Sequence, residues 1–261
     1  MTLPKLYIFR AGLLECKYCD IYLNQGSDRD WQIPVPFYVI DHPRGKVIID
    51  GGTPVECARD AKGHWGAVAE FLRPVLQEEE GCVNQIEAMG WKAEEFRYVV
   101  LSHLHLDHVG AVGRFPEATH VVQRAEMHYA MSPDWFQQLA YVRKDFDQPG
   151  LKWHVLDEGW GDFYDLYGDG SIILIRSPGH TVGHQSILVK TASGHVLLAV
   201  DAADTMDHWE ERALPGALHS AVDAVRSVRK LREVAARTDA LVIAGHDQAQ
   251  FEMLKLAPEY Y

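Results

Sequence analysis

The chain has 261 residues, 47% of them hydrophobic, and a formal net charge of −12 at pH 7. This length and composition suffice for one large domain with a substantial core, so we expect residues 1–261 to form a single domain. An acidic surface repels phosphate backbones, which argues against nucleic acid as a partner, and the sequence has no run of 18 apolar residues that would indicate a membrane span.

The N-terminus and the cysteines predict a cytoplasmic protein. Residues 1–5 lack the charged start, apolar middle and cleavage site of a signal peptide. Cys16 and Cys19 form a C-x-x-C pair, but Cys57 and Cys82 are isolated, so a structural zinc site has no second pair. We therefore expect four reduced thiols without a ligand.

Apolar runs separated by turn residues predict the elements of the first hundred residues. The expected strands cover residues 5–10, 36–41, 46–50 and 98–101. The expected helices cover residues 65–76 and 83–89. A polar connection separates the first two strands, and Gly51 and Gly52 allow a sharp turn after Asp50.

The second half continues as short strands with helices between them. The expected strands cover residues 119–123, 152–156, 171–176, 184–190, 195–201 and 241–244. The expected helices cover residues 124–131 and 218–236, and residues 133–147 are expected to form a helical excursion over the surface, which a homodimer could use. This mixture predicts a layered α/β architecture without a linker between domains.

The segment after the strand at 98–101 has the densest group of candidate metal-binding side chains. It reads Ser-His-Leu-His-Leu-Asp-His-Val-Gly and places three imidazoles and a carboxylate within six residues. In an extended strand end His103 and His105 point the same way, and after the chain turns Asp107 and His108 can face a neighbouring position. Such a group suits two adjacent ions of zinc, iron, manganese or cobalt. Without a metal, burying these groups would cost about 1–3 kcal/mol for each unpaired one.

Three further candidate ligands follow three other predicted strands. His180 comes after the strand at 171–176, Asp201 closes the strand at 195–201, and His246 follows the strand at 241–244. Loops at strand ends are where a rigid sheet presents functional groups. We therefore expect these side chains to join the first group.

The order of these motifs resembles the metallo-β-lactamase superfamily, and within it the N-acyl homoserine lactone lactonases. The chain has H-x-H-x-D-H, then P-G-H-T-x-G-H, then an aspartate after an apolar strand, then G-H-D, across residues 103–247. Further matching segments lie at residues 5–7, 122–126, 184–186, 200–202 and 258–260. The resemblance therefore covers nearly the whole chain.

The resemblance implies a four-layer αββα sandwich and a dinuclear metal site, with zinc first and iron, cobalt or manganese as alternatives. His103, His105 and His180 would hold one ion. Asp107, His108 and His246 would hold the other, and Asp201 would bridge both. Asp50 and His184 would orient the ligands, as metal-binding imidazoles usually require, and Asp247 is a further partner of this kind.

The same resemblance implies a reaction. A hydroxide shared by the two ions would attack the ester carbonyl of an N-acyl homoserine lactone, and the ring would open to the hydroxy acid, which is quorum quenching. Asp107 or water would protonate the leaving alkoxide. No G-x-S-x-G nucleophile motif is present.

One position departs from the lactonase pattern. Lactonases usually have a tyrosine three residues after the bridging aspartate, where its hydroxyl helps to hold the substrate carbonyl, whereas this chain has Asp204. Asp204 could be protonated, point away, or donate through a water, and Tyr18 could supply the missing donor instead. Leu106 is a candidate for contact with the substrate.

Other functions of the same superfamily stay open at this point. A glyoxalase-II-like thioesterase or the hydrolase of another lactone would use the same metal site. A flavin-linked di-iron oxygen reductase is disfavoured, because such proteins typically have Glu where this chain has His105. A non-catalytic metal-binding protein is disfavoured because all seven ligands are present.

Overall fold

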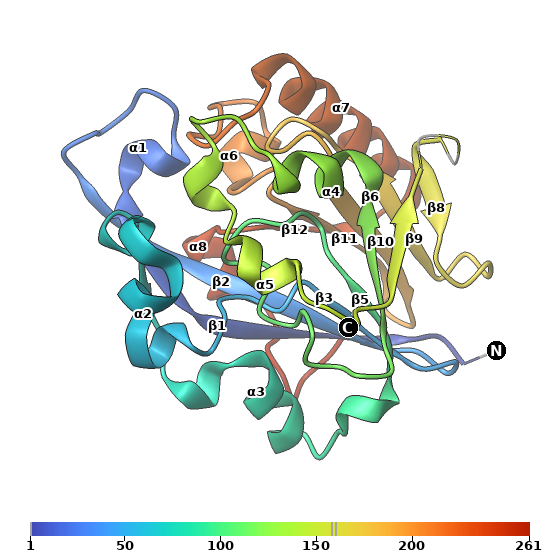
Figure 1. Ribbon diagram of the computed structural model, residues 1–261. Coiled ribbons are helices and arrows are strands. Elements are labelled where there is room, and N and C mark those ends of the chain that lie inside the picture. The colour runs from blue at the N-terminus through green and yellow to red at the C-terminus, as the bar shows by residue number, and fades with distance from the viewer. Residues whose placement is uncertain (1, 158, 160) are drawn as a thin grey trace.

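Two sheets packed face to face form the centre of the protein (Figure 1). The structure is a computed structural model that describes residues 2–157, 159 and 161–261. Within these residues the first sheet has seven strands in the order β4-β1-β2-β3-β5-β6-β7, and the second has five in the order β12-β11-β10-β9-β8. None of the helices that these residues form is long and apolar enough to span a membrane.

The strands follow the chain so that each sheet comes from one half of it. The first sheet consists of β1 (Lys5–Lys17), β2 (Asp30–Asp41), β3 (Lys46–Ile49), β4 (Arg73–Val75), β5 (Phe96–Val100), β6 (Thr119–Gln123) and β7 (Trp153–Leu156). The second consists of β8 (Phe163–Asp165), β9 (Ile172–Arg176), β10 (Gln185–Thr191), β11 (Gly194–Val200) and β12 (Leu241–Ala244).

Helices and 3₁₀ turns connect the strands. The α-helices are α1 (Tyr18–Ile21), α2 (Cys57–Trp65), α3 (Cys82–Ala88), α4 (Arg124–Met131), α5 (Arg143–Phe146), α6 (Met206–Trp209), α7 (Ala221–Thr238) and α8 (Gln248–Phe251). The 3₁₀ turns are η1 (Gly66–Glu70), η2 (Glu78–Glu80), η3 (Ala93–Glu95) and η4 (Gln138–Ala140).

Three apolar clusters hold the layers together. Between the sheets, Ile8 and Ile40 of the first sheet pack with Leu174 and Leu198 of the second. On the outer face of the first sheet, Ile86 of α3 and Ala130 of α4 join side chains such as Phe9 and Phe37. On the outer face of the second sheet, Val228 and Leu231 of α7 cover Leu197 and Ala199. Helix α7 and helix α3 lie on opposite sides of the two sheets (Figure 1), which is the expected αββα arrangement.

Strand direction determines where the functional loops meet. In the first sheet β3, β5, β6 and β7 are parallel neighbours. In the second sheet β11 is parallel to β12, and β9 runs in the same direction because β10 is antiparallel to both β9 and β11. The carboxyl ends of β9, β11 and β12 therefore lie at one edge of this sheet, and the loops that follow them can converge there.

Two predicted segments were wrong. Residues 11–17 continue β1 instead of forming a polar connection, because Leu14 and Cys16 are buried while the polar side chains between them lie further out. Residues 65–76 do not form an α-helix: α2 ends at Trp65, Gly66 has a φ of +76°, residues 66–70 form only the 3₁₀ turn η1, and residues 73–75 form the edge strand β4, where Pro74 is tolerated.

The other predicted elements lie at or near their expected positions, but several short elements were not predicted. Helix α4 covers residues 124–131 as predicted, and α7 begins three residues later than expected. Residues 133–147 contain only η4 and α5. The sequence reasoning omitted β8 and the helices α1, α2, α6 and α8.

Candidate metal centre

The seven predicted ligands gather at the carboxyl ends of the strands, four from the first sheet and three from the second. The loop after β5 carries His103, His105, Asp107 and His108, whereas His180, Asp201 and His246 follow β9, β11 and β12. All but Asp107 are at most 7% exposed. The Asp107 side chain is 13% exposed, so it is the ligand most open to solvent.

Glycine and strained backbone make this convergence possible. Val200, which precedes Asp201, has a φ of +49°, and Asp50, which follows β3, has a φ of +63°. Both values are unusual for side chains with a Cβ and indicate backbone that the surroundings hold in place. Gly110 lies against Gly51, where an added Cβ would stand 2.5 Å from the Gly51 carbonyl oxygen, so only glycine allows this approach.

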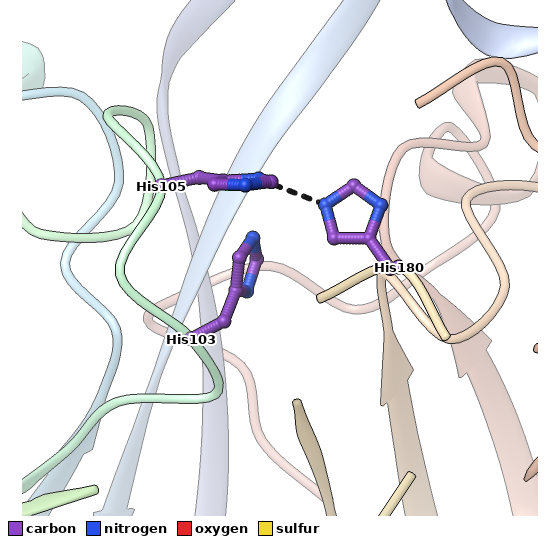
Figure 2. A group of neighbouring side chains, drawn as sticks. All are labelled: His103, His105 and His180. Atoms are coloured by element: carbon purple, nitrogen blue, oxygen red, sulfur yellow. Dashed lines mark hydrogen bonds between the residues drawn. The ribbon is translucent and has the colours of Figure 1, made fainter. Parts of the chain in front are cut away.

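Three imidazoles form the first half of the centre. His103, His105 and His180 have ligand atoms that all lie within 4.8 Å of one another. Figure 2 shows the rings converging from two loops, with His105 Nδ1 2.9 Å from His180 Nε2. Burial lowers the pKa of each of these three side chains, so the imidazoles are neutral, which is the form that binds a metal.

Asp201 lies in the middle of the centre. Its Oδ2 is 3.3 Å from His180 Nε2, 3.4 Å from His108 Nε2 and 3.7 Å from His103 Nε2, and its Oδ1 is 3.3 Å from His246 Nε2. Burial alone would raise the pKa of Asp201, but the surrounding imidazoles hold it well below its usual range. A charged carboxylate in contact with both groups of ligands is the geometry that a bridging ligand needs.

The second half of the centre contains Asp107, His108 and His246, whose ligand atoms also lie within 4.8 Å of one another. Burial would lower the pKa of His108 and of His246, but the carboxylates around them raise it, to about 9 for His246 and well above the usual value for His108. This excess of negative charge attracts positive charge to the site, whether a proton or a metal ion.

Hydrogen bonds to the outer ring nitrogens orient the imidazoles. His180 Nδ1 donates to the Ala217 carbonyl oxygen at 3.0 Å, and His246 Nδ1 donates to the Pro34 carbonyl oxygen at 2.8 Å. A proton fixed on Nδ1 leaves the Nε2 lone pair directed into the centre, as metal-binding histidines require.

Asp50 orients two more of the histidines, as predicted. Its Oδ2 accepts from His108 Nδ1 at 2.9 Å and from the Ser102 hydroxyl at 2.9 Å, and its Oδ1 accepts from the Ser102 N–H at 2.7 Å. The Ser102 oxygen in turn lies 2.9 Å from His103 Nδ1. One buried carboxylate therefore holds His108 directly and His103 through Ser102.

His184 and Asp247 differ in what they contact. His184 Nδ1 lies 2.9 Å from the Ser177 hydroxyl, and its ring packs 5.3 Å from that of His103, while burial lowers its pKa to about 3. Asp247 instead accepts from the N–H groups of Met206 and Gln250, so it links the starts of α6 and α8, and within the described residues it makes no hydrogen bond to a candidate ligand.

Asp204 faces the centre instead of pointing away. One of its oxygens is grouped within 4.8 Å of ligand atoms of His180 and Asp201, and the residue is 3% exposed. Burial raises the pKa of Asp204 well above its usual range, and the charge of Asp201 adds to the effect. Its burial and the nearby charge of Asp201 therefore favour the protonated form of Asp204, which was one of the alternatives left open from the sequence.

The two predicted substrate contacts belong to one apolar cluster. Leu106 is 1% exposed and packs in an apolar cluster with Cys16, Tyr22 and Trp65. Tyr18 stacks on Tyr22 with ring centroids 4.3 Å apart. Tyr22, which the sequence reasoning did not select, is the tyrosine that contacts α6, through His208 at 5.1 Å.

Sequence reasoning also missed Glu126, which braces both ligand loops. Its buried carboxylate accepts from the Leu104 N–H at 3.0 Å and the Tyr141 hydroxyl at 3.2 Å, and from the Thr181 hydroxyl at 2.6 Å and the Gly183 N–H at 3.1 Å. Leu104 lies between two ligands, and Thr181 follows His180. The match of residues 122–126 to the lactonases was the only sequence signal for this role.

The atoms that lack a partner indicate a cation. Among the described residues, the Nε2 atoms of His103, His105 and His108 and Oδ1 of Asp201 are buried without a hydrogen bond. Each would cost about 1–3 kcal/mol if it stayed unsatisfied. They are all imidazole or carboxylate atoms and all point into one space, so the donor set fits divalent transition metals.

Comparison with known proteins supports this interpretation. The family model described as the metallo-beta-lactamase superfamily matches residues 31–246. The chain is 57% identical to N-acyl homoserine lactonase AttM of Rhizobium johnstonii and 53% identical to AttM of Agrobacterium fabrum, with all of each chain covered. A solved structure of an N-acyl homoserine lactone hydrolase, with the product N-hexanoyl-L-homoserine bound at its catalytic metal centre, matches with a TM-score of 0.89 and 27% identity over all of both chains.

Proposed function

The chain belongs to the metallo-β-lactamase superfamily and, within it, to the N-acyl homoserine lactonases, and we propose that its buried centre opens the lactone ring with two divalent metal ions. The observation that carries this proposal is the set of unpartnered imidazole and carboxylate atoms around Asp201. The protein is a hydrolase that acts in quorum quenching.

We propose the division of the ligands that the resemblance implies. In our proposal His103, His105 and His180 hold one ion, Asp107, His108 and His246 hold the other, and Asp201 contacts both. When bound, the two ions supply Lewis acidity for the ester carbonyl and lower the pKa of a water molecule toward about 7. We propose zinc as the metal, because imidazole and carboxylate ligands suit it, with iron, cobalt and manganese as the alternatives.

The protein's own groups position the substrate and move the proton. Asp107, the most exposed of the ligands, is the group from which the leaving alcohol takes its proton in this proposal. Asp50 and His184 keep the imidazoles oriented. Leu106 closes the apolar side of the site, and Tyr18 supports the neighbouring Tyr22.

The role of Asp204 is proposed from its position. It faces His180 and Asp201, so its carboxyl group is in place to contact the lactone where a tyrosine stands in most lactonases. Asp204→Tyr and Asp204→Asn measure this role through kcat/KM for an N-acyl homoserine lactone. If both variants match the wild type, Asp204 is a bystander.

Proton release tests the function directly. We expect metal-replete protein to release a proton on addition of an N-acyl homoserine lactone, and chelated protein to release none until metal is restored. Asp201→Asn should lower kcat/KM by more than about 100-fold, since losing even an outer partner of a ligand costs about 10–100-fold. The matched control is Asp239→Asn, an exposed residue at the end of α7.

The same experiment separates the alternatives. If the lactone is not cleaved while elemental analysis finds two ions per chain, the substrate is another lactone or a thioester. If no metal binds, the proposed centre itself is wrong.

Two further proposals concern the state of the protein in the cell. We propose cytoplasmic residence, which the four free thiols support, because a reducing compartment keeps cysteines unpaired. We also propose a homodimer through residues 133–147, where Trp135, Phe136 and Leu139 are more than half exposed. Light scattering on the wild type and on Trp135→Ser tests the second proposal, and a monomeric wild type would exclude it.

A further inference from the structure

Asp204 belongs to a group of candidate ligands, although it is not one of the seven predicted ones. Among the described residues, four groups of three side chains have ligand atoms that all lie within 4.8 Å of one another. Three of these groups contain only predicted ligands, whereas the fourth consists of His180, Asp201 and Asp204. Asp204 therefore meets the same geometric condition as the residues already assigned to the metal ions.

The backbone holds Asp204 in this position. Its carbonyl oxygen accepts from the His246 N–H at 2.7 Å, which ties the loop after β11 to the loop after β12. Two residues further along, the Met206 N–H donates to Asp247 at 2.8 Å, so the start of α6 is bonded to the same loop. The segment that carries Asp204 is thus fastened at two places to the loop of a predicted ligand.

One oxygen of the Asp204 carboxyl group has no hydrogen-bond partner within the described part of the chain. The side chain is 4% exposed, and the atom without a partner is the buried Oδ1. His208 does not donate to the carboxyl group, although its Nδ1 lies 3.9 Å from Asp204 Oδ2, because this nitrogen already accepts from the Thr205 N–H at 3.2 Å. A buried carboxyl oxygen without a donor, next to metal-binding side chains, indicates a cation as its partner.

The spacing of the group matches a single metal ion. Zinc bonds to imidazole nitrogen and carboxylate oxygen are about 2.0–2.2 Å long, so two ligand atoms of one ion lie up to about 4.4 Å apart. Separations within 4.8 Å are close to this span. Because His180 is assigned to the first half of the centre, Asp204 would join the ion of that half.

We propose that Asp204 is an eighth ligand of the centre and binds the ion assigned to the three histidines of its first half. The inference rests on the proposed dinuclear centre and adds to it a third carboxylate, beside Asp107 and Asp201, where most lactonases have a tyrosine. One carboxylate oxygen suffices for the ion, so the other remains free to contact the lactone as proposed above.

Cobalt substitution tests the coordination directly. Metal-free wild type, Asp204→Asn and Asp204→Tyr are loaded with Co²⁺; asparagine matches aspartate in shape, and tyrosine is the residue that lactonases usually have there. The visible absorption bands of Co²⁺ depend on its ligands and strengthen as its coordination number falls, so both variants should have shifted or stronger bands. The matched control is Asp207→Asn, because Asp207 lies in the same segment but bonds Arg212 and Tyr22.

Zinc affinity provides the magnitude. Losing even an outer partner of a ligand costs about 10–100-fold in metal affinity, so Asp204→Asn should weaken the binding of one ion by at least about 10-fold in chelator competition. Melting temperatures separate a ligand from a structural residue. Metal-free Asp204→Asn should be at least as stable as metal-free wild type, because the lost carboxyl group is buried without a partner for Oδ1, whereas zinc should raise its melting temperature less.

The outcomes separate this inference from the function on which it rests. If Asp204→Asn and the wild type have the same cobalt spectrum, or bind zinc equally, Asp204 is not a ligand. The same conclusion follows if Asp207→Asn weakens zinc binding as much, or if Asp204→Asn is destabilised equally with and without metal.

The spectra and affinities are measured without substrate. A wild type that binds two ions but opens no lactone would therefore overturn the proposed lactonase function alone. A wild type that binds no metal would overturn both the centre and the role of Asp204 in it.

Discussion

Replacing Asp50 gives the sharpest test of the candidate metal centre, because this one buried carboxylate orients two histidines. In Asp50→Asn, the atom at the Oδ2 position must be either an oxygen or an NH₂ group. If it is NH₂, it faces the His108 Nδ1–H and forces the other tautomer, which places a proton on Nε2 where a metal should bind. If it is oxygen, the NH₂ group faces the Ser102 N–H instead. In either orientation one N–H donor therefore points at another donor and a hydrogen bond is lost.

The expected magnitude follows from the bonds that are lost. A hydrogen bond to a charged group contributes about 1.5–3 kcal/mol, which corresponds to a loss of roughly 10–100-fold in metal affinity, the range known for outer partners of ligands. The loss of affinity should fall mainly on the ion that His108 is proposed to hold. The variant should therefore bind one ion tightly and the other weakly.

Competition with a chromophoric chelator measures both affinities. Zinc is titrated into metal-free wild type, Asp50→Asn and Asp30→Asn; the last is the control, because the Asp30 side chain is 91% exposed and bonds only Lys17 among the described residues. If Asp50→Asn binds both ions with wild-type affinity, the proposed orienting role of Asp50 is refuted.

Three further changes test the support of the centre and the surface. Glu126→Gln places an NH₂ group among four donors and should lower the free energy of unfolding by about 1–3 kcal/mol in urea titrations; an unchanged midpoint would contradict its bracing role. Gly183→Ala puts a Cβ 2.2 Å from the Glu126 backbone nitrogen and should cost about 1–3 kcal/mol or more by the same assay, whereas a neutral result would mean that α4 moves freely. Burial raises the pKa of Asp169, but hydrogen bonds from Ser171 and the charge of Arg44 together outweigh burial and lower this pKa to about 2. The ionised Asp169 therefore stabilises the fold fully above about pH 4, and this stabilisation is lost as the pH falls toward 2. Asp169→Asn should remove about 1 kcal/mol or less of this pH-dependent stability, measured by melting curves at several pH values. Identical pH dependence in the wild type and the variant would contradict this role of Asp169.

The clustering of the candidate ligands could be predicted because its signal is local. Four of them lie within six residues, and each of the others directly follows an apolar strand, so strand ends alone brought His180, Asp201 and His246 to the same edge. The αββα fold was predicted from resemblance and agrees with the two sheets and their outer helices.

The supporting contacts could not be predicted, because they depend on how distant segments pack. The carbonyls of Pro34 and Ala217 bond His246 and His180, yet a carbonyl has no signature in a sequence. Helical spacing at residues 65–76 was misleading, since Gly66 and the pairing of β4 with β1 prevailed over the local pattern. That the chain is one domain stays a prediction.

Because of the order of the strands along the chain, a single cut would divide the protein into two fragments that each contain one sheet. Residues 5–156 supply every strand of one sheet and residues 163–244 every strand of the other, among the residues that the structure describes. Each half carries only part of the ligand set, and Asp201 belongs to the second half. If the chain is cut between β7 and β8, neither fragment can complete the centre alone. Reassembly of the two fragments would then depend on metal, so the concentration of metal ions would control fragment complementation.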